Sequence, residues 1–376
     1  IPVIRAFSRE KHEEERFEKA NLDLTKTNLF VNRVMTCMMP AMMLTMNAVT
    51  VLIVWVGADK INAGGMQVGD LMAFIQYTMQ IVMSFLMISM MSIMLPRATV
   101  SANRIQEVLE TEVEIADPAR PEDFVPSKTG EVEFQDVSFR YPGADEDVLE
   151  NITFTAKKGE TTAFIGSTGS GKSTLVNLIP RFYDATKGRI LVNGRDVREV
   201  TQHELRARIG YVPQKGVLFS GTIESNLKYG GDSISDRDME QAAQIAQATE
   251  FIGAKPDGYQ SEISQGGGNV SGGQKQRLSI ARAIAKHPEI YIFDDSFSAL
   301  DYKTDVALRK ELKEKTAGAT VLIVAQRIST ILHAEQIIVL DEGKIVGKGT
   351  HEELLQSCEV YQQIALSQLS KEELAS

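Results

Sequence analysis

Two long apolar stretches dominate the first part of the hydrophobic pattern. Residues 34–56 and 71–95 contain no charged side chain, and each is long enough to cross the hydrocarbon core of a bilayer, which takes a helix of about 20 residues. The intervening residues 57–69 form a short loop, so the pattern predicts a transmembrane helical hairpin. Asp70 stands at the start of the second helix, where we expect an N-cap at the membrane interface rather than a transport carboxylate.

The polar flanks of this hairpin extend its helices. Charged and apolar residues in 1–30 recur at the spacing of a solvated amphipathic helix. After Pro96 the helical pattern continues, and a cluster of prolines then breaks it. We therefore expect a partial membrane domain over residues 1–110 and a linker over residues 111–130.

The pattern of the chain changes at Glu131. Short runs of β-branched and aromatic residues then alternate with helical patterns, which predicts an α/β domain with a mainly parallel core sheet. The expected strands are 132–134, 137–139, 162–165, 189–192, 209–212, 290–293, 321–324 and 337–339. Residues 241–251 are expected to be one stretch of a helical insert. We assign residues 131–369 to this domain and residues 370–376 to a C-terminal tail.

Residues 166–174 fit the phosphate-loop pattern G-x-x-x-x-G-K-[ST] at every fixed position. An apolar strand precedes them, and a helix that ends before Pro180 follows them. The glycines let backbone N–H groups turn inward around a polyphosphate, and the helix N-terminus adds positive potential. Lys172 is expected to reach the β- and γ-phosphates, and the Ser173 hydroxyl to ligate Mg²⁺. The candidate nucleotide-binding residues are Gly166, Ser167, Thr168, Gly169, Ser170, Gly171, Lys172, Ser173 and Thr174.

Two further motifs support a nucleotide site. The strand at 290–293 ends in Asp294 and Asp295, and we expect it beside the strand that precedes the phosphate loop, with Asp294 holding Mg²⁺. A second phosphate cap precedes a helix expected at 275–285. It consists of Ser271, Gly272, Gly273 and Gln274. Because one nucleotide does not need two such caps, the pattern predicts a composite site shared with a second subunit.

Composition narrows the class of protein. The net charge is −10 and the isoelectric point is about 5.2, which argues against broad nucleic-acid binding. The two cysteines, Cys37 and Cys358, lie in very different segments, so we expect reduced thiols rather than a disulfide. The chain begins Ile1-Pro2 without a methionine, and we expect it to be a fragment of a longer protein.

Together these motifs resemble the ATP-binding cassette (ABC) exporter family, and the resemblance extends over the whole of residues 131–369. Residues 166–174 match its Walker A motif, residues 290–294 its Walker B motif and residues 271–274 its signature motif. Further matches are the D-loop at residues 298–301, the Q-loop glutamine at Gln214 and, at Tyr141, the aromatic residue that stacks on adenine.

The resemblance implies an antiparallel β-subdomain beside the parallel core. It also implies that residues 1–110 correspond to the last two helices of a six-helix exporter domain. In this family two nucleotide domains close head to tail around two ATP molecules, each held between one chain's Walker motifs and the other chain's signature. Ser173, Gln214 and Asp294 are the implied Mg²⁺ ligands. Because ATP is cytosolic, we expect the nucleotide domain on the cytoplasmic side of the plasma membrane and the hairpin turn outside.

Three positions depart from the family pattern. The family has Glu as general base after the Walker B aspartate, whereas this chain has Asp295. Its carboxylate is retracted by roughly 1.5 Å, and a general base contributes about 10²–10⁴-fold to the rate. Gln326 stands where the family has the switch-loop His, and Gln265 where many exporters have Glu. With Gln214, Asp295 and Gln326 as catalytic residues and a signature that is nearly intact, we expect the impaired half of a heterodimeric exporter.

The leading expectation is an ATP-driven exporter subunit for small hydrophobic molecules such as drugs, with lipids or peptides as the next candidates. The many methionines of both apolar stretches are typical of lipid-facing or helix-packing surface and give drugs only weak support. Asn47, Gln76 and Gln80 are better candidates for lining a cavity. One alternative is a homodimer in which Asp295 is an adequate base, and another is a mainly regulatory ATP-binding subunit. A soluble ABC protein of DNA repair or translation is disfavoured by the apolar hairpin and the acidic charge.

Overall fold

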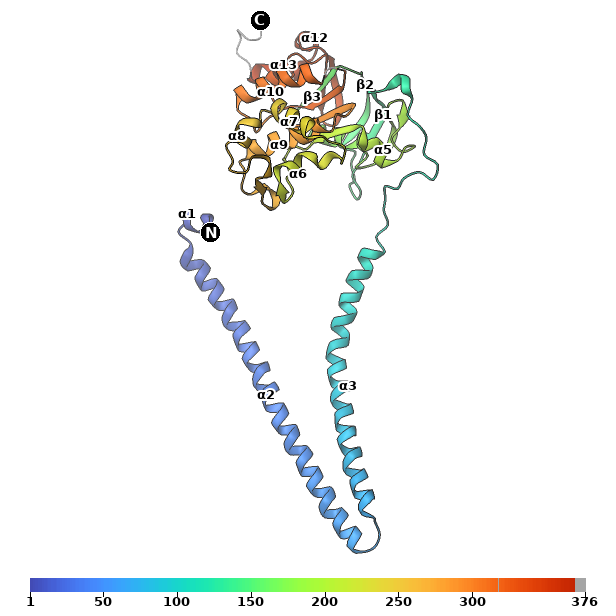
Figure 1. The fold of residues 1–376 in the computed structure, drawn as a ribbon, viewed down its shortest axis with the longest axis vertical. Helices are drawn as coiled ribbons and strands as arrows, with labels where there is room; N and C mark the ends of the chain where they lie inside the picture. The colour runs from blue at the N-terminus through green and yellow to red at the C-terminus, as the bar shows by residue number, and fades with distance from the viewer. Residues whose placement is uncertain (317, 369–376) are drawn as a thin grey trace. The chain divides into compact units, whose positions relative to one another are not determined.

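The computed structural model describes residues 1–316 and 318–368. The chain divides into two compact units, the first over residues 1–112 and the second from Val113 onward (Figure 1). The first unit is built from helices alone, and the second contains all the strands. Leu369 and the tail assigned to residues 370–376 lie outside the described residues.

The first unit consists of two long helices and a short one. They are α1 (Pro2–Ala6), α2 (Glu10–Asn62) and α3 (Val68–Leu109). Both long helices contain an apolar window that is long enough to cross a membrane, with mean hydropathies of 1.9 and 1.8, and neither window is buried within this chain. The two predicted apolar helices are therefore confirmed, and each continues through an internal proline, Pro40 in α2 and Pro96 in α3.

The turn between the two helices is tighter than the sequence predicts. Helix α2 continues to Asn62, so the expected loop at 57–69 is mostly helical. Asp70 is not the N-cap: Gln67 occupies that position, and its backbone N–H donates to Asp70 Oδ2 at 3.0 Å. The carboxylate thus satisfies a free amide from the third helical position, as in a capping box. Gly57 is buried because the Leu71 side chain occupies the space that a Cβ at Gly57 would need.

The core of the second unit is a six-stranded sheet with the order β12-β11-β3-β10-β9-β6. Five of its strands are parallel and β12 pairs antiparallel with β11. The strands are β3 (Thr161–Gly166), β6 (Ile209–Val212), β9 (Ile290–Asp294), β10 (Thr320–Val324), β11 (Gln336–Asp341) and β12 (Lys344–Gly349). The mainly parallel core is therefore confirmed. The Walker B strand β9 does not lie beside β3 as expected, because β10 lies between them.

A four-stranded antiparallel sheet with the order β2-β1-β4-β5 lies in the same unit, as the resemblance implies. Its strands are β1 (Val132–Phe139), β2 (Leu149–Ala156), β4 (Lys187–Val192) and β5 (Arg195–Asp196). The two strands expected at 132–134 and 137–139 form one strand with an irregular register, where Asp136 has a φ of +50°. A third, two-stranded sheet pairs β7 (Gly221–Thr222) with β8 (Glu262–Ile263).

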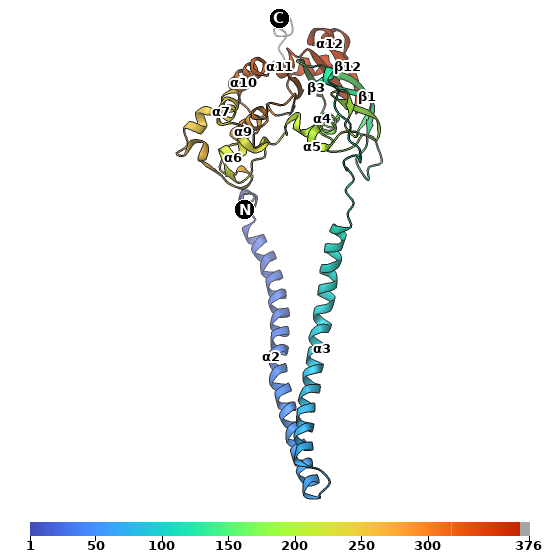
Figure 2. The ribbon, with the colours of Figure 1, turned by 45° about the vertical axis from the view of Figure 1, so that its right-hand side comes forward.

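Helices cover the sheets and form the insert. They are α4 (Lys172–Leu178), α5 (Gln202–Ala207), α6 (Ile223–Leu227), α7 (Asp236–Ile245), α8 (Thr249–Gly253), α9 (Gly272–Ala285), α10 (Tyr302–Lys315), α11 (Ile328–Ile331), α12 (His351–Ser357) and α13 (Glu359–Gln368). Figure 2 shows α6, α7 and α9 grouped on the side of this unit opposite β1 and β12. The helical insert expected around 241–251 is present as two helices, because Gln247 adopts a φ of +56° and separates α7 from α8.

Candidate functional site

The phosphate loop connects the end of β3 to the start of α4, and two of its glycines are required by close approaches. A Cβ at Gly166 would lie 2.0 Å from the carbonyl oxygen of Leu340 on the neighbouring strand β11. A Cβ at Gly171 would lie 2.7 Å from Leu149 Cδ2, and this residue also has a φ of +92°. Thr168 and Gly169 at the tip are exposed. The loop therefore packs against the protein on its inner side and presents its tip outward.

Lys172 is the buried cation of this loop. Its Nζ donates hydrogen bonds to the carbonyl oxygens of Gly166 at 2.8 Å and Ser167 at 2.6 Å, and to Ser170 Oγ at 3.3 Å. Burial lowers the pKa of Lys172, while the negative charges of Asp295 and Asp294 act in the opposite direction. A buried ammonium group inside a glycine loop at a helix N-terminus is suited to bind a polyphosphate.

Ser173 and Asp294 meet at the carboxyl-terminal edge of the core sheet. Ser173 Oγ donates to Asp294 Oδ1 at 2.8 Å. They meet although β9 and β3 are not neighbours, because the parallel strands between them end at the same edge. Burial raises the pKa of Asp294, and the hydrogen bond from Ser173 partly opposes this rise. A cation at this position would favour the ionised carboxylate.

This pair of oxygen ligands fits Mg²⁺. Magnesium is commonly held by one or two protein oxygens together with substrate phosphates and waters. Among the described residues, no group of three or more His, Cys, Asp or Glu side chains could hold a metal ion. The site therefore has the donors for a nucleotide-borne Mg²⁺ rather than for a metal bound by protein ligands alone.

The three candidate catalytic residues converge on one carboxylate. Asp295 Oδ2 accepts hydrogen bonds from Gln326 Nε2 at 2.6 Å and from Gln214 Nε2 at 3.2 Å. Asp295 directly follows β9, while Gln214 and Gln326 lie just after β6 and β10. Asp295 is buried and has a φ of +47°, a left-handed conformation that aspartate tolerates better than most residues. Both amides thus hold the same oxygen of the candidate base.

Tyr141 lies beside the first turn of α4. Its hydroxyl is 3.0 Å from Thr174 Oγ1. Its ring packs edge to face against Phe139 and Tyr183, with centroid distances of 4.8 and 5.2 Å. Sequence reasoning missed Tyr183, which supports the candidate adenine-stacking ring from a loop, and no spacing signal in the sequence links the two tyrosines.

Ser271 is the N-cap of α9, which begins at Gly272 rather than at the predicted residue 275. Its hydroxyl accepts from the backbone N–H of Gln274 at 3.2 Å, and its own N–H donates to Gln274 Oε1 at 3.1 Å. Ser271 and Gly272 are exposed, and Gly273 is partly exposed. Within the described part of the chain, the Ser271 and Gln274 side chains form no hydrogen bond with the phosphate loop.

Each of the two units contains a match to a known protein family. Residues 149–298 match the ABC transporter family, and residues 1–85 match the ABC transporter transmembrane region. The chain belongs to the ABC transporter family. The second match covers α2 and the first part of α3, so the two apolar helices of this ABC transporter chain are those of a membrane region.

Individual relatives agree with this assignment. An uncharacterized ABC transporter ATP-binding protein of Mycobacterium tuberculosis is 47% identical over 98% of this chain. The probable multidrug resistance ABC transporter ATP-binding/permease protein YheI of Bacillus subtilis is 35% identical over 94% of it. The chain spans 63% and 60% of the lengths of these relatives.

A solved structure has the same fold. The structure of a bacterial Atm1-family ABC exporter with ATP bound matches with a TM-score of 0.83 at 32% identity, and the match covers 98% of this chain and 65% of that one. The two apolar helices and the α/β domain therefore have the fold of an ABC exporter.

Proposed function

We propose that this chain is an ATP-binding and hydrolysing subunit of a membrane exporter, and that the nucleotide site on its own Walker motifs turns over slowly. Its signature, Ser271 to Gln274, would complete the site of a partner half-transporter. Membership of the ABC transporter family and the two apolar helices support the first statement. The exposed start of α9 is compatible with the second.

The binding residues have separate tasks. Lys172 supplies positive charge to the β- and γ-phosphates, the glycine loop supplies backbone N–H groups, and Tyr141 supplies a ring for adenine. Ser173, Asp294 and Gln214 would hold Mg²⁺, which would supply positive charge to the phosphates. Binding would exchange the carbonyl partners of Lys172 for phosphate oxygens, and a cation bound with the nucleotide would favour the ionised form of the buried Asp294 carboxylate.

The geometry of Asp295 is the observation that carries the proposal of slow turnover. A general base must present a free lone pair within hydrogen-bond reach of the water that it activates. Here the bonds from Gln214 and Gln326 to Oδ2 fix the orientation of the carboxylate and leave Oδ1 as the oxygen for the water, and the aspartate side chain is one methylene shorter than glutamate. The amide of Gln326 also carries no charge at physiological pH, so it cannot act as a protonated histidine would.

We propose a heterodimer in the plasma membrane, with a partner that has Glu and His at the positions of Asp295 and Gln326. The proposed cargo is a small hydrophobic molecule, in line with the name of YheI. A homodimer that moves lipids or peptides is the alternative. A mainly regulatory subunit would retain ATP without releasing phosphate, which a phosphate-release assay on the complex separates from slow hydrolysis.

The test restores the family's residues. In the full-length subunit purified with its partner, the partner's own Walker A lysine is replaced so that only this chain's site turns over. We expect Asp295→Glu with Gln326→His to raise ATP hydrolysis by at least about tenfold. Asp295→Asn is the matched control and should not raise it.

The opposite result is equally definite. If the wild-type chain purified alone hydrolyses ATP briskly, and Asp295→Asn abolishes that activity, then its own site is competent and the proposal of an impaired half is wrong. If Lys172→Ala leaves nucleotide affinity unchanged, the proposal of an ATP-binding subunit is itself overturned.

A further inference from the structure

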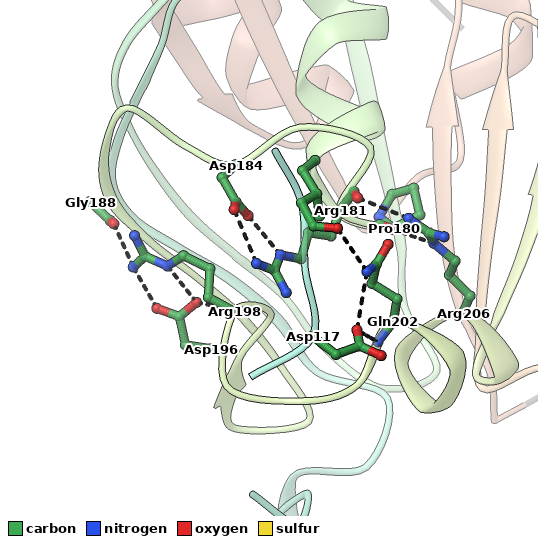
Figure 3. A network of polar contacts seen from close by, with 10 residues as sticks. Asp117, Pro180, Arg181, Asp184, Gly188, Asp196, Arg198, Gln202 and Arg206 are labelled. Carbon is green, nitrogen blue, oxygen red and sulfur yellow. Dashed lines mark hydrogen bonds and ion pairs between the residues drawn. The ribbon is translucent and has the colours of Figure 1, made fainter. Parts of the chain in front are cut away.

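The linker that follows α3 forms its first hydrogen bonds with the nucleotide domain only a few residues after the end of α3. Asp117 lies a few residues after Leu109, where α3 ends. Its Oδ1 accepts from the backbone N–H of Gln202 at 2.9 Å and from Gln202 Nε2 at 3.1 Å, as Figure 3 shows. The same Nε2 donates to the carbonyl oxygen of Ile115 at 3.2 Å. Gln202 therefore binds two points of the linker.

Charge strengthens this attachment. Hydrogen bonds from Gln202 hold the pKa of Asp117 below its ordinary value, and the positive charges of Arg181 and Arg206 act in the same direction. Asp117 also accepts from the first free amide of α5, which is the role of an N-terminal cap supplied from a distant segment. The carboxylate is thus ionised and available to bind Gln202 at neutral pH.

Helix α5 also binds the end of the Walker A helix. Arg206 Nε donates to the carbonyl oxygen of Pro180 at 3.0 Å, and its Nη2 donates to that of Arg181 at 3.0 Å. These two carbonyls follow directly after α4, whose first residue is Lys172. Figure 3 shows Arg206 beside Pro180 and Gln202 beside Asp117. Arg206 and Gln202 both belong to α5.

The signature helix is bound to the same short element. Lys286, the C-cap of α9, donates through Nζ to the carbonyl oxygen of Arg206 at 2.5 Å and to that of Ile209 at 2.9 Å. Helix α9 starts next to Ser271. One element of six residues therefore contacts the linker and the ends of both helices whose N-termini carry the phosphate-binding motifs.

We propose that Asp117, Gln202, Arg206 and Lys286 form a tether clamp, which couples movement of the nucleotide-binding helices to the end of α3. The proposal rests on the proposed function of the chain as an exporter subunit. It assigns a coupling role to residues that touch neither phosphate loop nor signature, and it makes Asp117 and Gln202 positioning residues rather than catalytic ones.

Tether length explains why the attachment point matters. With Asp117 bound, residues 110–117 separate α3 from the domain, and an extended chain of this length spans roughly 26–29 Å. Without the bonds of Gln202 to Asp117 and Ile115, the next attachment is the backbone N–H of Glu122, which donates to the carbonyl oxygen of Glu199 at 2.8 Å. Five more residues would add roughly 17 Å of slack. A longer tether transmits less of a given displacement.

The experiment measures transmission separately from hydrolysis. A fluorophore sensitive to its environment is attached to Ala63→Cys, in the turn between α2 and α3, in the full-length complex in lipid. The exposed Cys37 is replaced by alanine, and Cys358 is buried. The signal is the change in emission on addition of ATP and vanadate. Asp117→Ala and Gln202→Ala are compared with Glu114→Ala, an exposed carboxylate of the same linker.

We expect Asp117→Ala and Gln202→Ala to keep ATP hydrolysis within about twofold of wild type and to reduce the emission change at least about fivefold. The double variant should show the largest loss, because Asp117→Ala leaves Gln202 Nε2 bound to the Ile115 carbonyl and Gln202→Ala leaves the Gln202 backbone N–H bound to Asp117. Glu114→Ala should behave as wild type in both measurements.

Two results would overturn the tether clamp. One is an emission change in Asp117→Ala equal to that of Glu114→Ala. The other is a parallel loss of hydrolysis and emission change with a lowered unfolding temperature, which is the result for a purely structural contact. If instead the proposed function is wrong, the result differs, because Lys172→Ala would then retain both hydrolysis and the emission change.

Discussion

Gly166 is the residue of the phosphate loop that tolerates a side chain least. An added Cβ would lie 2.0 Å from the carbonyl oxygen of Leu340, which is backbone held in the core sheet. We expect Gly166→Ala to reduce the free energy of unfolding by about 3 kcal/mol, the upper part of the range for overpacked sites. Chemical denaturation without nucleotide measures this value.

Gly169 provides the matched control within the same loop. It has a φ of +88°, but no atom lies within 4 Å of an added Cβ. Gly169→Ala should cost only the left-handed conformation, about 1–2 kcal/mol. Equal losses for the two variants would show that conformation, and not the contact with Leu340, fixes Gly166.

At the same scale, the sequence predicts which residues belong to the site better than how they interact. Lys172 and Ser173 have fixed places because the motif spacing prescribes a strand, a loop and a helix. The bonding of Asp295 to both Gln214 and Gln326 could not be predicted, because three separate strand ends supply the partners. That convergence depends on the strand order, which a local pattern does not contain.

Among the elements, α9 and α7 start with the same capping arrangement. Ser271 pairs with Gln274 at the start of α9, and Ser235 pairs with Asp238 at the start of α7. Both serine hydroxyls accept a backbone N–H at 3.2 Å. Ser271→Ala should therefore lower stability by about 1 kcal/mol, and Ser235→Ala by at least as much, because the Ser235 hydroxyl also donates to Asp238 Oδ2 at 2.6 Å. Thermal unfolding of the two variants measures this.

Only one of these caps is expected to matter for activity. Ser271 belongs to the signature proposed to contact the partner's ATP, so Ser271→Ala should reduce ATP hydrolysis of the complex by about tenfold or more, as for loss of a group that binds the transferred phosphate. Ser235→Ala should leave hydrolysis unchanged. If both variants lose activity in proportion to their stability, Ser271 acts as a helix cap alone.

The contact between α12 and α13 gives this unit a pH-dependent contribution to stability. His351 Nδ1 lies 2.7 Å from the Tyr361 hydroxyl. Burial is the main reason that the pKa of His351 lies below its ordinary value; His333 lowers it further and Glu352 opposes this. As the pH falls through the ordinary value, 6.5, the unfolded chain takes up a proton before the folded chain does, so stability falls.

His351→Asn tests this contribution, because asparagine can keep a polar contact with Tyr361 without titrating. The free energy of unfolding of the wild type should drop more between pH 7.5 and pH 5.5 than that of the variant. Denaturant titrations at the two pH values provide the comparison. Parallel losses in both proteins would assign the acid sensitivity to other groups.

The strands that the sequence did not predict lack a regular pattern of buried apolar residues. Strand β2 lacks a regular alternation because Asn151 has a φ of +51° and shifts its register. Strand β12 is at a sheet edge, where its side chains are exposed or only partly buried, so its hydrophobic signal is weak. By contrast, β9 and β10 are fully buried and have continuous apolar sequences. Strand β6 is at the opposite edge of the same sheet, yet it is largely buried and its range was predicted. Buried strands are therefore predictable, and exposed or irregular strands are not.

On the scale of the whole molecule, the second unit contains its own hydrophobic cores. Both clusters of buried apolar side chains lie entirely within it. We expect residues 113–376 to fold without the first unit and to unfold cooperatively. Circular dichroism during heating of this fragment measures the transition.

A shorter fragment that starts at Glu131 tests the linker. It lacks the stacking of Arg208 on the Phe124 ring, 4.2 Å from the guanidinium carbon to the centroid, and the bond from Val125 N–H to the Asn193 carbonyl at 3.0 Å. Its unfolding temperature should be lower by several degrees, as for a loss of about 1–2 kcal/mol. Identical temperatures would mean that the linker adds no stability.

Pro40 and Pro96 give the two apolar helices a property of their own. Each proline lacks an amide hydrogen, so the carbonyl groups of Thr36 and Ser92, four residues earlier, have no donor within the helix. These helices therefore bend more easily at one known place than a regular helix of equal length. A pull at the C-terminal end of α3 would reach Pro96 before the apolar span, so we expect bending of α3 to concentrate at that proline.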